Sequence, residues 1–360
     1  MFPLEFTERI KNQSGIDAGN LIEALSSPAP VSIRVNSHKW HHDVATADSV
    51  PGEKDGYYLP SRPLFTMDPL YHAGVYYPQE ASSMFAGEAF RQLTTGAEGL
   101  RVLDLSAAPG GKSTHISSLL GDGSYLVANE VIRARAAVLA ENITKWGIGN
   151  VLVTQNDPSA FAPLKGFFDI IFVDAPCSGE GMFRDETARK EWSPANAQMC
   201  SERQRRIVMD VWPALKKGGY MVYSTCTFNP AENEENVYRL AETTGAESVT
   251  LDVSHFDGIT TLRRGDVISY AFYPGKIRGD GFFLSVLQKK TEDESGFRFG
   301  KRQKIKVTPA GDALSALLRG DSNVFIKDNR IISYACGLRD FEMLSASLNI
   351  IKAGTMPGEL

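Results

Sequence analysis

The feature that most constrains the fold is the alternation of short apolar runs with helical segments across residues 99–290. Short apolar runs are typical of strands that are buried on both faces, and a helix after each strand returns the chain for a parallel neighbour. The alternation therefore predicts one doubly wound α/β domain with a mainly parallel sheet. The expected strands are 101–105, 124–129, 151–154, 168–173 and 220–223, and the expected helices are 112–120, 131–146 and 204–215.

The regions around this domain have a different character. Two later apolar segments, 268–272 and 282–287, predict an antiparallel pair at one sheet edge. Before the domain, mixed segments punctuated by proline predict a small α+β extension. The chain ends on turn-forming residues, so we expect it to stop within or before a further domain. The expected boundaries are 1–97 for the extension, 98–290 for the α/β domain, 291–305 for a polar linker and 306–360 for a small C-terminal module.

Composition and charge exclude several classes of protein. A hydrophobic fraction of 42% is that of a globular chain, and no apolar run approaches the roughly 18 residues of a membrane span. The net charge of −5 excludes nucleic-acid binding by bulk charge but permits a local basic groove. Four cysteines are too few for a disulfide framework, so we expect reduced thiols in a cytoplasmic protein. We also expect a monomer without a membrane partner.

The metal-ligating residue types form no convincing site. The cluster of histidines around Trp40 has no cysteine or carboxylate at a ligand-like spacing. We therefore expect no metal. Two of the cysteines, Cys200 and Cys336, lie outside any motif and are expected to be packing residues.

A small-residue loop after the first expected strand indicates a ligand site, because ligands of open α/β sheets bind beyond the carboxyl ends of the strands. A phosphate-binding P-loop would need glycine where Ser106 stands, which disfavours a nucleotide hydrolase, and the dinucleotide fingerprint is absent. Glu130 after the second strand suits ribose hydroxyls, and Asp157 after the third suits an exocyclic amine. Together they suggest S-adenosylmethionine. The candidate cofactor residues are Ser106, Ala107, Ala108, Pro109, Gly110, Gly111, Lys112, Glu130, Asp157 and Asp174.

Two cysteines fall at the ends of the fourth and fifth expected strands. Cys177 follows Asp174, and Cys226 follows the fifth strand. If these strands are neighbours, the two thiols share one cleft. A thiolate that adds to carbon 6 of cytosine activates carbon 5 for methylation, with a carboxyl group at the ring nitrogen and a base for the carbon 5 proton. A Cys177–Cys226 disulfide is the redox alternative, and the residues alone leave open which cysteine is the nucleophile.

Three segments closely resemble the signature motifs of the Fmu/Sun family of RNA (cytosine-5) methyltransferases. They are DLSAAPGGKS (104–113), DAPCSGEGMFR (174–184) and YSTCTFNPAENEENV (223–237), and SIRVN (32–36), YYPQEASSM (76–84) and YPGKIRGDGFF (273–283) are also similar to family segments. The resemblance implies a class I S-adenosylmethionine-dependent methyltransferase fold, Rossmann-like, with an N-terminal RNA-contacting extension. The RsmF-like branch, whose ribosomal RNA enzymes usually carry a further C-terminal RNA-binding domain, is the most similar.

On this resemblance Cys226 attacks carbon 6, Cys177 assists proton removal and release, and Asp174 contacts the cytosine ring. Lys112 either helps to position these groups or forms a structural ion pair. A base drawn into such a cleft also needs phosphate contacts. The candidates for RNA binding are Arg34, Lys112, Arg184 and Arg205, with a further basic run at Lys301, Arg302, Lys304 and Lys306 in the linker.

The sequence leaves two other functional hypotheses open. One is a non-catalytic RNA-binding or ribosome assembly factor on the same fold, against which the presence of both motif cysteines counts. The other is a transfer RNA rather than a ribosomal RNA substrate.

Overall fold

The computed structural model describes residues 1–40, 48–291, 308–309, 323–327 and 330–359. The chain divides into two compact units. The first comprises Met1–Leu93, Val173–Val208 and Tyr220–Thr291, and the second comprises Thr94–Phe172, Met209–Gly219 and Glu292–Leu360. The basic run predicted for the linker lies outside the described residues.

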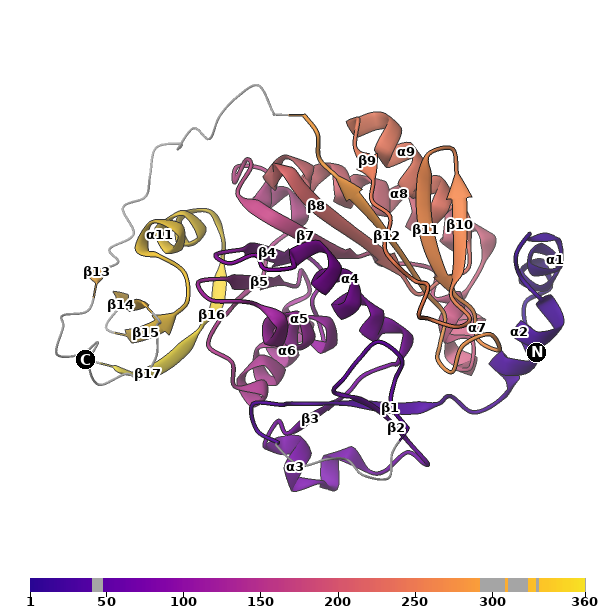
Figure 1. Ribbon diagram of the computed structural model, residues 1–360, viewed down its shortest axis with the longest axis horizontal. Coiled ribbons are helices and arrows are strands. Elements are labelled where there is room, and N and C mark those ends of the chain that lie inside the picture. Colours follow the sequence, from indigo (N-terminus) through magenta and orange to yellow (C-terminus); the bar gives the residue numbers. More distant parts are fainter. Residues whose placement is uncertain (41–47, 292–307, 310–322, 328–329, 360) are drawn as a thin grey trace. The chain divides into compact units, whose positions relative to one another are not determined.

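The second unit contains the predicted parallel sheet. Its strands are ordered β7 (Phe168–Asp174), β4 (Arg101–Asp104), β5 (Tyr125–Asn129) and β6 (Val151–Thr154), all parallel. Every residue of β5 and β6 is buried, as the apolar runs predict. Helices α5 (Gly111–Leu119) and α6 (Arg133–Trp146) contact β5 and β6, respectively. The two helices lie beside each other in Figure 1. The α/β fold prediction is therefore confirmed.

The first unit contains the antiparallel strands. Strand β8 (Leu215–Thr225), whose final residues belong to this unit, pairs with β12 (Phe282–Gln288), which pairs with β11 (Val267–Phe272). This confirms the antiparallel pair expected from the sequence. A further strand, β10 (Thr260–Arg264), pairs with β11 and lies beside it in Figure 1. Sequence analysis misses β10 because its residues are polar and largely exposed.

Shorter elements connect the strands of both units. The helix α8 (Pro194–Val211) begins before Gln204, where the sequence pattern predicts its start. The pattern does not reveal the first turns because they lack a regular apolar stripe. Helix α9 (Glu234–Thr244) follows the second cysteine motif and contacts β10 and β11. The remaining elements are η3 (Pro158–Phe161), η4 (Glu180–Met182), α7 (Glu186–Glu191), η5 (Trp212–Ala214) and β9 (Glu247–Ser248).

The N-terminal extension is α+β, as expected. Two helices, α1 (Leu4–Asn12) and α2 (Ala18–Ser26), precede an antiparallel sheet of order β2-β1-β3. The helix α1 buries Phe6 and Ile10, and α4 (Phe85–Thr94) leads towards β4. The sheet and its connections comprise β1 (Val31–Val35), β2 (Gly56–Leu59), η1 (Phe65–Met67), α3 (Pro69–His72), β3 (Tyr76–Pro78) and η2 (Ser82–Met84).

The C-terminal residues form a small sheet and also extend the sheet of the second unit. The small sheet has the order β13-β14-β15-β17. Strand β16 (Ile350–Ala353) instead pairs antiparallel with β6. This pairing is not evident in the sequence, because a run as short as IIKA does not reveal its partner. The bounds are β13 (Thr308–Pro309), β14 (Asn323–Lys327), β15 (Arg330–Tyr334), α11 (Leu338–Ser347) and β17 (Thr355–Glu359).

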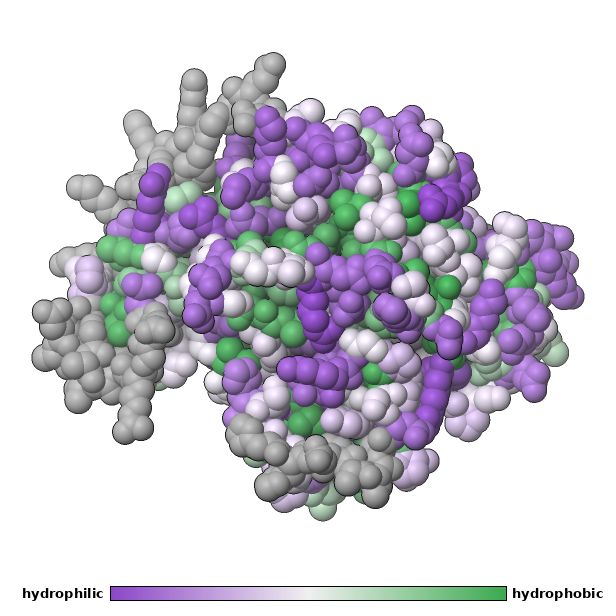
Figure 2. Space-filling view, viewed as in Figure 1, coloured by the Kyte–Doolittle hydropathy of each residue, from purple (hydrophilic) through white to green (hydrophobic). Residues whose placement is uncertain are grey.

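The visible surface in Figure 2 is mainly hydrophilic, with small apolar patches between the polar side chains. This distribution is ordinary for a protein with buried apolar cores. Within the described parts of the chain, no helix is both long enough and apolar enough to cross a membrane.

Asp340 at the start of α11 joins the C-terminal segment to the parallel sheet of the second unit. Its carboxylate accepts hydrogen bonds from Arg101 Nε at 2.8 Å and from the Tyr125 hydroxyl at 2.9 Å. We expect Asp340→Ala to lower the free energy of unfolding by about 1–2 kcal/mol, because the charged bonds are partly shielded from water. Urea titration tests this expectation.

The matched control is Glu186→Ala. Glu186 pairs with Lys190 at 3.0 Å, but both side chains are more than two-thirds exposed. An exposed pair of this kind stabilises by less than about 1 kcal/mol. Equal effects of the two substitutions would show that Asp340 anchors nothing.

Candidate active site

Cys177 and Cys226 lie next to each other in the first unit, as their strand-end positions predict. Their Sγ atoms are 3.2 Å apart, and the backbone amide of Cys226 donates to Cys177 Sγ at 3.4 Å. Both are free thiols and partly accessible. Cys200 and Cys336, by contrast, are buried, as packing residues would be. The arrangement presents two accessible sulfur atoms at one place.

The strand ends bring these thiols together. The amide of Ala175 donates to the Ser224 carbonyl at 2.8 Å, which joins the end of β7 to the end of β8. Asp174, the last residue of β7, is half-buried and accepts a hydrogen bond from Ser224 Oγ at 2.7 Å. The hydroxyl thus orients one carboxylate oxygen of Asp174, three residues before Cys177.

The Cys177 thiol is held in its protonated form. Its hydrogen bond with Cys226, its burial and the nearby negative charge of Glu232 all raise its pKa well above the ordinary value. A thiol with a raised pKa is a poor nucleophile but retains a proton that it can give to a neighbouring group.

Glu232 is a buried carboxylate that sequence analysis missed. It accepts hydrogen bonds from the amide of Ser178 at 2.8 Å, from Ser178 Oγ at 2.5 Å and from Gln204 Nε2 at 3.1 Å. No ion pair to Glu232 is found within the described residues. Burial therefore raises its pKa to about 7, although these hydrogen bonds oppose the shift.

Glu180 is a second buried carboxylate at this site. It forms an ion pair with Arg9 of α1 at 2.5 Å and accepts from Trp192 Nε1 at 3.1 Å and from the amide of Phe228 at 3.2 Å. Burial raises its pKa, and Arg9 counteracts the shift. The acidic residues that follow each cysteine in the sequence were the available signal for Glu180 and Glu232, but nothing in the sequence shows which of them are buried.

The predicted cofactor loop runs from β4 into α5 in the second unit. The amide of Ala107 donates to the Asn129 carbonyl at 2.8 Å, which fixes the loop beside the end of β5. Gly110 has φ of +120°, a conformation that L side chains rarely adopt, and a Cβ there would lie 3.3 Å from Leu139. Arg135 donates to the Ala108 carbonyl at 2.8 Å, while Ser113 Oγ binds Asp104 at 2.6 Å. The loop thus consists of small residues, is held by hydrogen bonds and packs closely against α6.

The two predicted acidic cofactor residues differ in setting. Glu130 is buried at the end of β5, accepts from the Ile132 amide at 2.9 Å and lies 3.4 Å from Arg135. Asp157 is exposed and caps η3, where it accepts from the amide and hydroxyl of Ser159 at 3.0 and 2.7 Å. Glu130 therefore has a fixed carboxylate, whereas Asp157 has the position of a helix cap.

The residues predicted to contact RNA differ in burial and in their partners. Arg34 is only 1% exposed and donates to Gln79 Oε1 at 2.9 Å, so it has the position of a structural residue rather than an accessible phosphate contact. Its burial lowers its pKa to about 10. Arg184 forms an ion pair with Asp280. Arg205 is half-buried near Asn236, and Lys112 is half-buried in α5.

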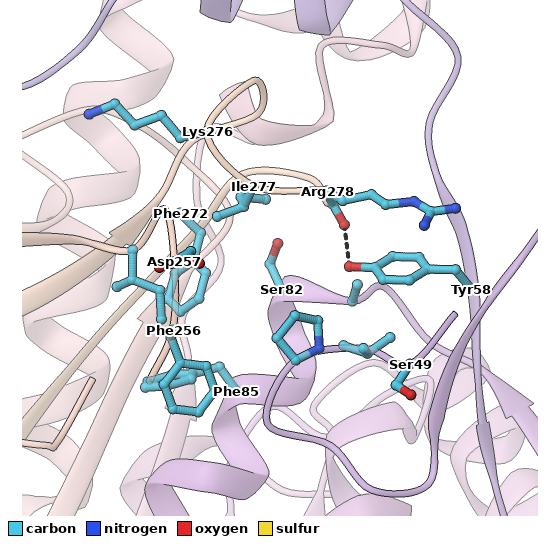
Figure 3. A pocket seen from close by; sticks show the side chains of 14 residues that line it. Ser49, Tyr58, Ser82, Phe85, Phe256, Asp257, Phe272, Lys276, Ile277 and Arg278 are labelled. Atoms are coloured by element: carbon cyan, nitrogen blue, oxygen red, sulfur yellow. Dashed lines mark hydrogen bonds between the residues drawn. The ribbon is translucent and has the colours of Figure 1, made fainter. Parts of the chain in front are cut away.

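A separate cavity of about 230 Å³ lies within the first unit. Its walls include Phe85, Phe256 and Phe272, and at its edge the Tyr58 hydroxyl donates to the Arg278 carbonyl at 2.6 Å (Figure 3). Neither motif cysteine lines it. Among the described residues, no group of three or more histidine, cysteine or acidic side chains is arranged to hold a metal ion.

Comparison with known families gives two matches along the chain. Residues 93–288 match the family described as 16S rRNA methyltransferase RsmB/F. Residues 2–81 match the N-terminal domain of 16S rRNA methyltransferase RsmF. The first match alone covers more than half of the chain and includes both cysteine motifs.

Curated relatives give the same result. Ribosomal RNA small subunit methyltransferase F of Vibrio vulnificus is 32% identical over 359 residues, covering 91% of this chain and 75% of the relative. The protein of the same name from Serratia proteamaculans is 41% identical over 221 residues, covering 60% of this chain and 45% of the relative.

Solved structures share the fold. A methyltransferase homologue from Pyrococcus horikoshii has a TM-score of 0.68 at 28% identity, covering 80% of this chain and 95% of that one. NSun6 from Pyrococcus horikoshii, in a structure with SFG, has a TM-score of 0.65 at 21% identity, covering 81% and 99%. At this identity the second similarity concerns the fold alone.

The raised pKa of Glu232 predicts a pH-dependent stability. The pKa of Glu232 is about 7 in the folded protein, against an ordinary value of 4.5. Protonated Glu232 therefore contributes fully to the free energy of unfolding below about pH 4.5, and this contribution is lost as the pH rises through 7. Glu232→Gln does not ionise, so its stability relative to the unchanged protein should increase between pH 5 and pH 8, by on the order of 2–3 kcal/mol. Urea unfolding at both pH values measures this difference.

Glu235→Gln provides the control for this measurement, because Glu235 lies in the same acidic segment and pairs with Arg264 at 3.3 Å. We expect the change between the two pH values to be larger for Glu232→Gln than for Glu235→Gln. A Glu232→Gln difference that is the same at both pH values would contradict the expected pKa.

Proposed function

Because the chain belongs to the family of 16S rRNA methyltransferases RsmB/F, we propose that it methylates carbon 5 of a cytosine in ribosomal RNA, using S-adenosylmethionine. The observation that carries this proposal is the 3.2 Å pairing of Cys177 with Cys226 beside Asp174. One cysteine activates the cytosine carbon for methylation by bonding to the ring. A second cysteine can assist when the bond between the ring and the first cysteine must break again. Ribosomal RNA as substrate would place the enzyme in the cytoplasm.

In the proposed reaction, Cys226 Sγ loses its proton and adds to carbon 6 of the cytosine. The carboxyl group of Asp174 hydrogen-bonds the ring nitrogen, which accommodates the charge that develops in the ring. Carbon 5 becomes nucleophilic and would take the methyl group from the sulfonium of bound S-adenosylmethionine, whose remainder would leave as a neutral thioether. A base assisted by Cys177 then removes the carbon 5 proton, the double bond re-forms, and Cys226 leaves as the free thiolate.

The two cysteines have different roles in this scheme. The family resemblance assigns the attack to Cys226. The surroundings of Cys177 are compatible with this assignment, because its hydrogen bond with Cys226, its burial and the charge of Glu232 raise its pKa. A group that holds a proton is suited to exchange it during release, whereas the attacking sulfur must act as a thiolate.

The residues of the loop between β4 and α5 fit S-adenosylmethionine. The buried alanines and Gly110 leave the backbone open to close approach, and the Glu130 carboxylate is fixed where a ribose would need an acceptor pair. Asp157 is proposed to accept from the adenine amine. When bound, the cofactor supplies an electrophilic methyl group.

Substitution of the two cysteines separates their roles. Cys226→Ala should abolish methyl transfer to RNA while leaving S-adenosylmethionine binding intact, because the sulfur acts only on the base. Cys177→Ala should instead accumulate a covalent protein–RNA adduct, seen as a shifted band in a denaturing gel. Methylation is followed with radiolabelled cofactor, and Cys200→Ala is the matched control, with normal turnover expected.

The reverse pattern, an adduct with Cys226→Ala, would exchange the two roles. Full activity of Cys226→Ala would refute covalent catalysis by this residue. If neither the unchanged protein nor any variant methylates ribosomal RNA, transfer RNA should be tried as the substrate. RNA binding without any methylation would favour a non-catalytic assembly factor.

Glu130→Ala tests the cofactor site. We expect its dissociation constant for S-adenosylmethionine to rise about tenfold, which corresponds to the loss of one charge-assisted hydrogen bond. Isothermal titration calorimetry measures the change. The control is Glu141→Ala, since Glu141 on α6 is 63% exposed and pairs with Lys145 at 2.6 Å. An unchanged affinity for Glu130→Ala would remove this residue from the site.

A further inference from the structure

The two cysteines belong to loops that are connected to each other by more than the thiols. We define the Cys177 loop as residues 175–183 and the Cys226 loop as residues 226–233. The amide of Gly181 in the first loop donates to the Cys226 carbonyl in the second at 2.9 Å. A Cβ at Gly181 would lie 2.8 Å from the Cys226 carbonyl oxygen, so the backbones of the two loops pack directly. The loops therefore form one close-packed unit.

Each loop also sends one buried carboxylate to the other. Glu232 of the Cys226 loop accepts from the amide and hydroxyl of Ser178, the residue after Cys177. Glu180 of the Cys177 loop accepts from the amide of Phe228 at 3.2 Å. Both carboxylates are 0% exposed. The connections are thus reciprocal and shielded from water, where hydrogen bonds to a charged group are strongest.

We propose that Glu180 and Glu232 form a reciprocal clamp between the two loops, and that Glu232 is the positioning residue that holds Cys177 at its distance from Cys226. This inference rests on the proposed function, because it assigns Glu232 a part in the release step attributed to Cys177. Glu232 touches neither substrate nor cofactor in this role. It acts through Ser178, which directly follows the cysteine.

The contacts of Glu232 explain how it can fix Cys177. One carboxylate oxygen accepts from the Ser178 amide and from Gln204, and the other accepts from Ser178 Oγ, with Thr227 Oγ1 at 3.4 Å. The backbone and the side chain of Ser178 are therefore held together. Without them the Cys177 loop would keep the contact at Gly181 but would lose its anchor next to the sulfur.

The two carboxylates differ in what a neutral substitution would do. Glu180 balances the charge of Arg9, so Glu180→Gln would leave that cation without its counter-charge. Among the described residues, the hydrogen-bond partners of Glu232 are uncharged. A glutamine at this position can accept from the Ser178 amide with its oxygen and donate to the two hydroxyls with its nitrogen, since hydroxyls both donate and accept. Glu232→Gln therefore preserves the clamp, whereas Glu232→Ala removes it.

The test compares Glu232→Ala, Glu232→Gln and Ser178→Ala in the full chain, with Glu235→Ala as the control. Glu232→Ala should lower kcat roughly 100-fold, the effect of misplacing a catalytic group by about 1 Å. Its KM for ribosomal RNA and for S-adenosylmethionine should stay within about twofold, and the covalent RNA adduct should accumulate as for Cys177→Ala. Ser178→Ala should give a smaller loss, about tenfold for one charge-assisted bond.

Glu232→Gln should restore turnover to within about fivefold of the unchanged protein and leave no adduct, which a purely structural defect would not predict. Normal kcat for both Glu232→Ala and Ser178→Ala would overturn the clamp. So would a Glu232→Gln variant as slow as Glu232→Ala. If Glu232→Ala does not fold, Ser178→Ala decides. Failure of the proposed function is distinguishable, because then Cys177→Ala itself would form no adduct.

Discussion

A backbone hydrogen bond from the Ala175 amide to the Ser224 carbonyl joins the strand ends on which the candidate active site depends. It aligns the last residues of β7 and β8, so that the residues just beyond them, including both cysteines, emerge side by side. The loops then need only short contacts to bring the sulfur atoms to 3.2 Å. Strand pairing of this kind is stable because the backbone groups would otherwise be buried without partners.

Burial of acidic groups is the second constraint on the site. Removing a carboxylate from water is costly unless it is paired or well hydrogen-bonded. The protein uses both solutions in the two cysteine loops: Glu180 has Arg9 of the N-terminal extension, while Glu232 has neutral donors and a raised pKa. The N-terminal extension thus contributes directly to the loop that carries Cys177, in addition to any contact it makes with RNA.

Sequence patterns predict the regular parts of the fold well and the irregular parts poorly. The apolar runs locate β4 to β7 because strands buried on both faces are recognisable without knowledge of their neighbours. They do not locate β10, whose side chains are mostly exposed, or reveal that β16 pairs with β6. Long-range pairing depends on complementary edges, which leave no local signal. Arg34 illustrates the same limit, because a buried arginine and a phosphate-binding arginine look identical in a sequence.

The sequence by itself determined the α/β class, the position of the small-residue loop, and the placement of Cys177 and Cys226 at strand ends, because periodicity and motif spacing are local properties. The tertiary structure alone decided which acidic residues became buried partners of the cysteine loops, since burial results from packing between distant segments. Glu180 meets Arg9 across 171 positions, and Glu232 meets Ser178 across 54. Such contacts set the pKa values and the loop geometry, and therefore the chemistry that the two thiols can perform.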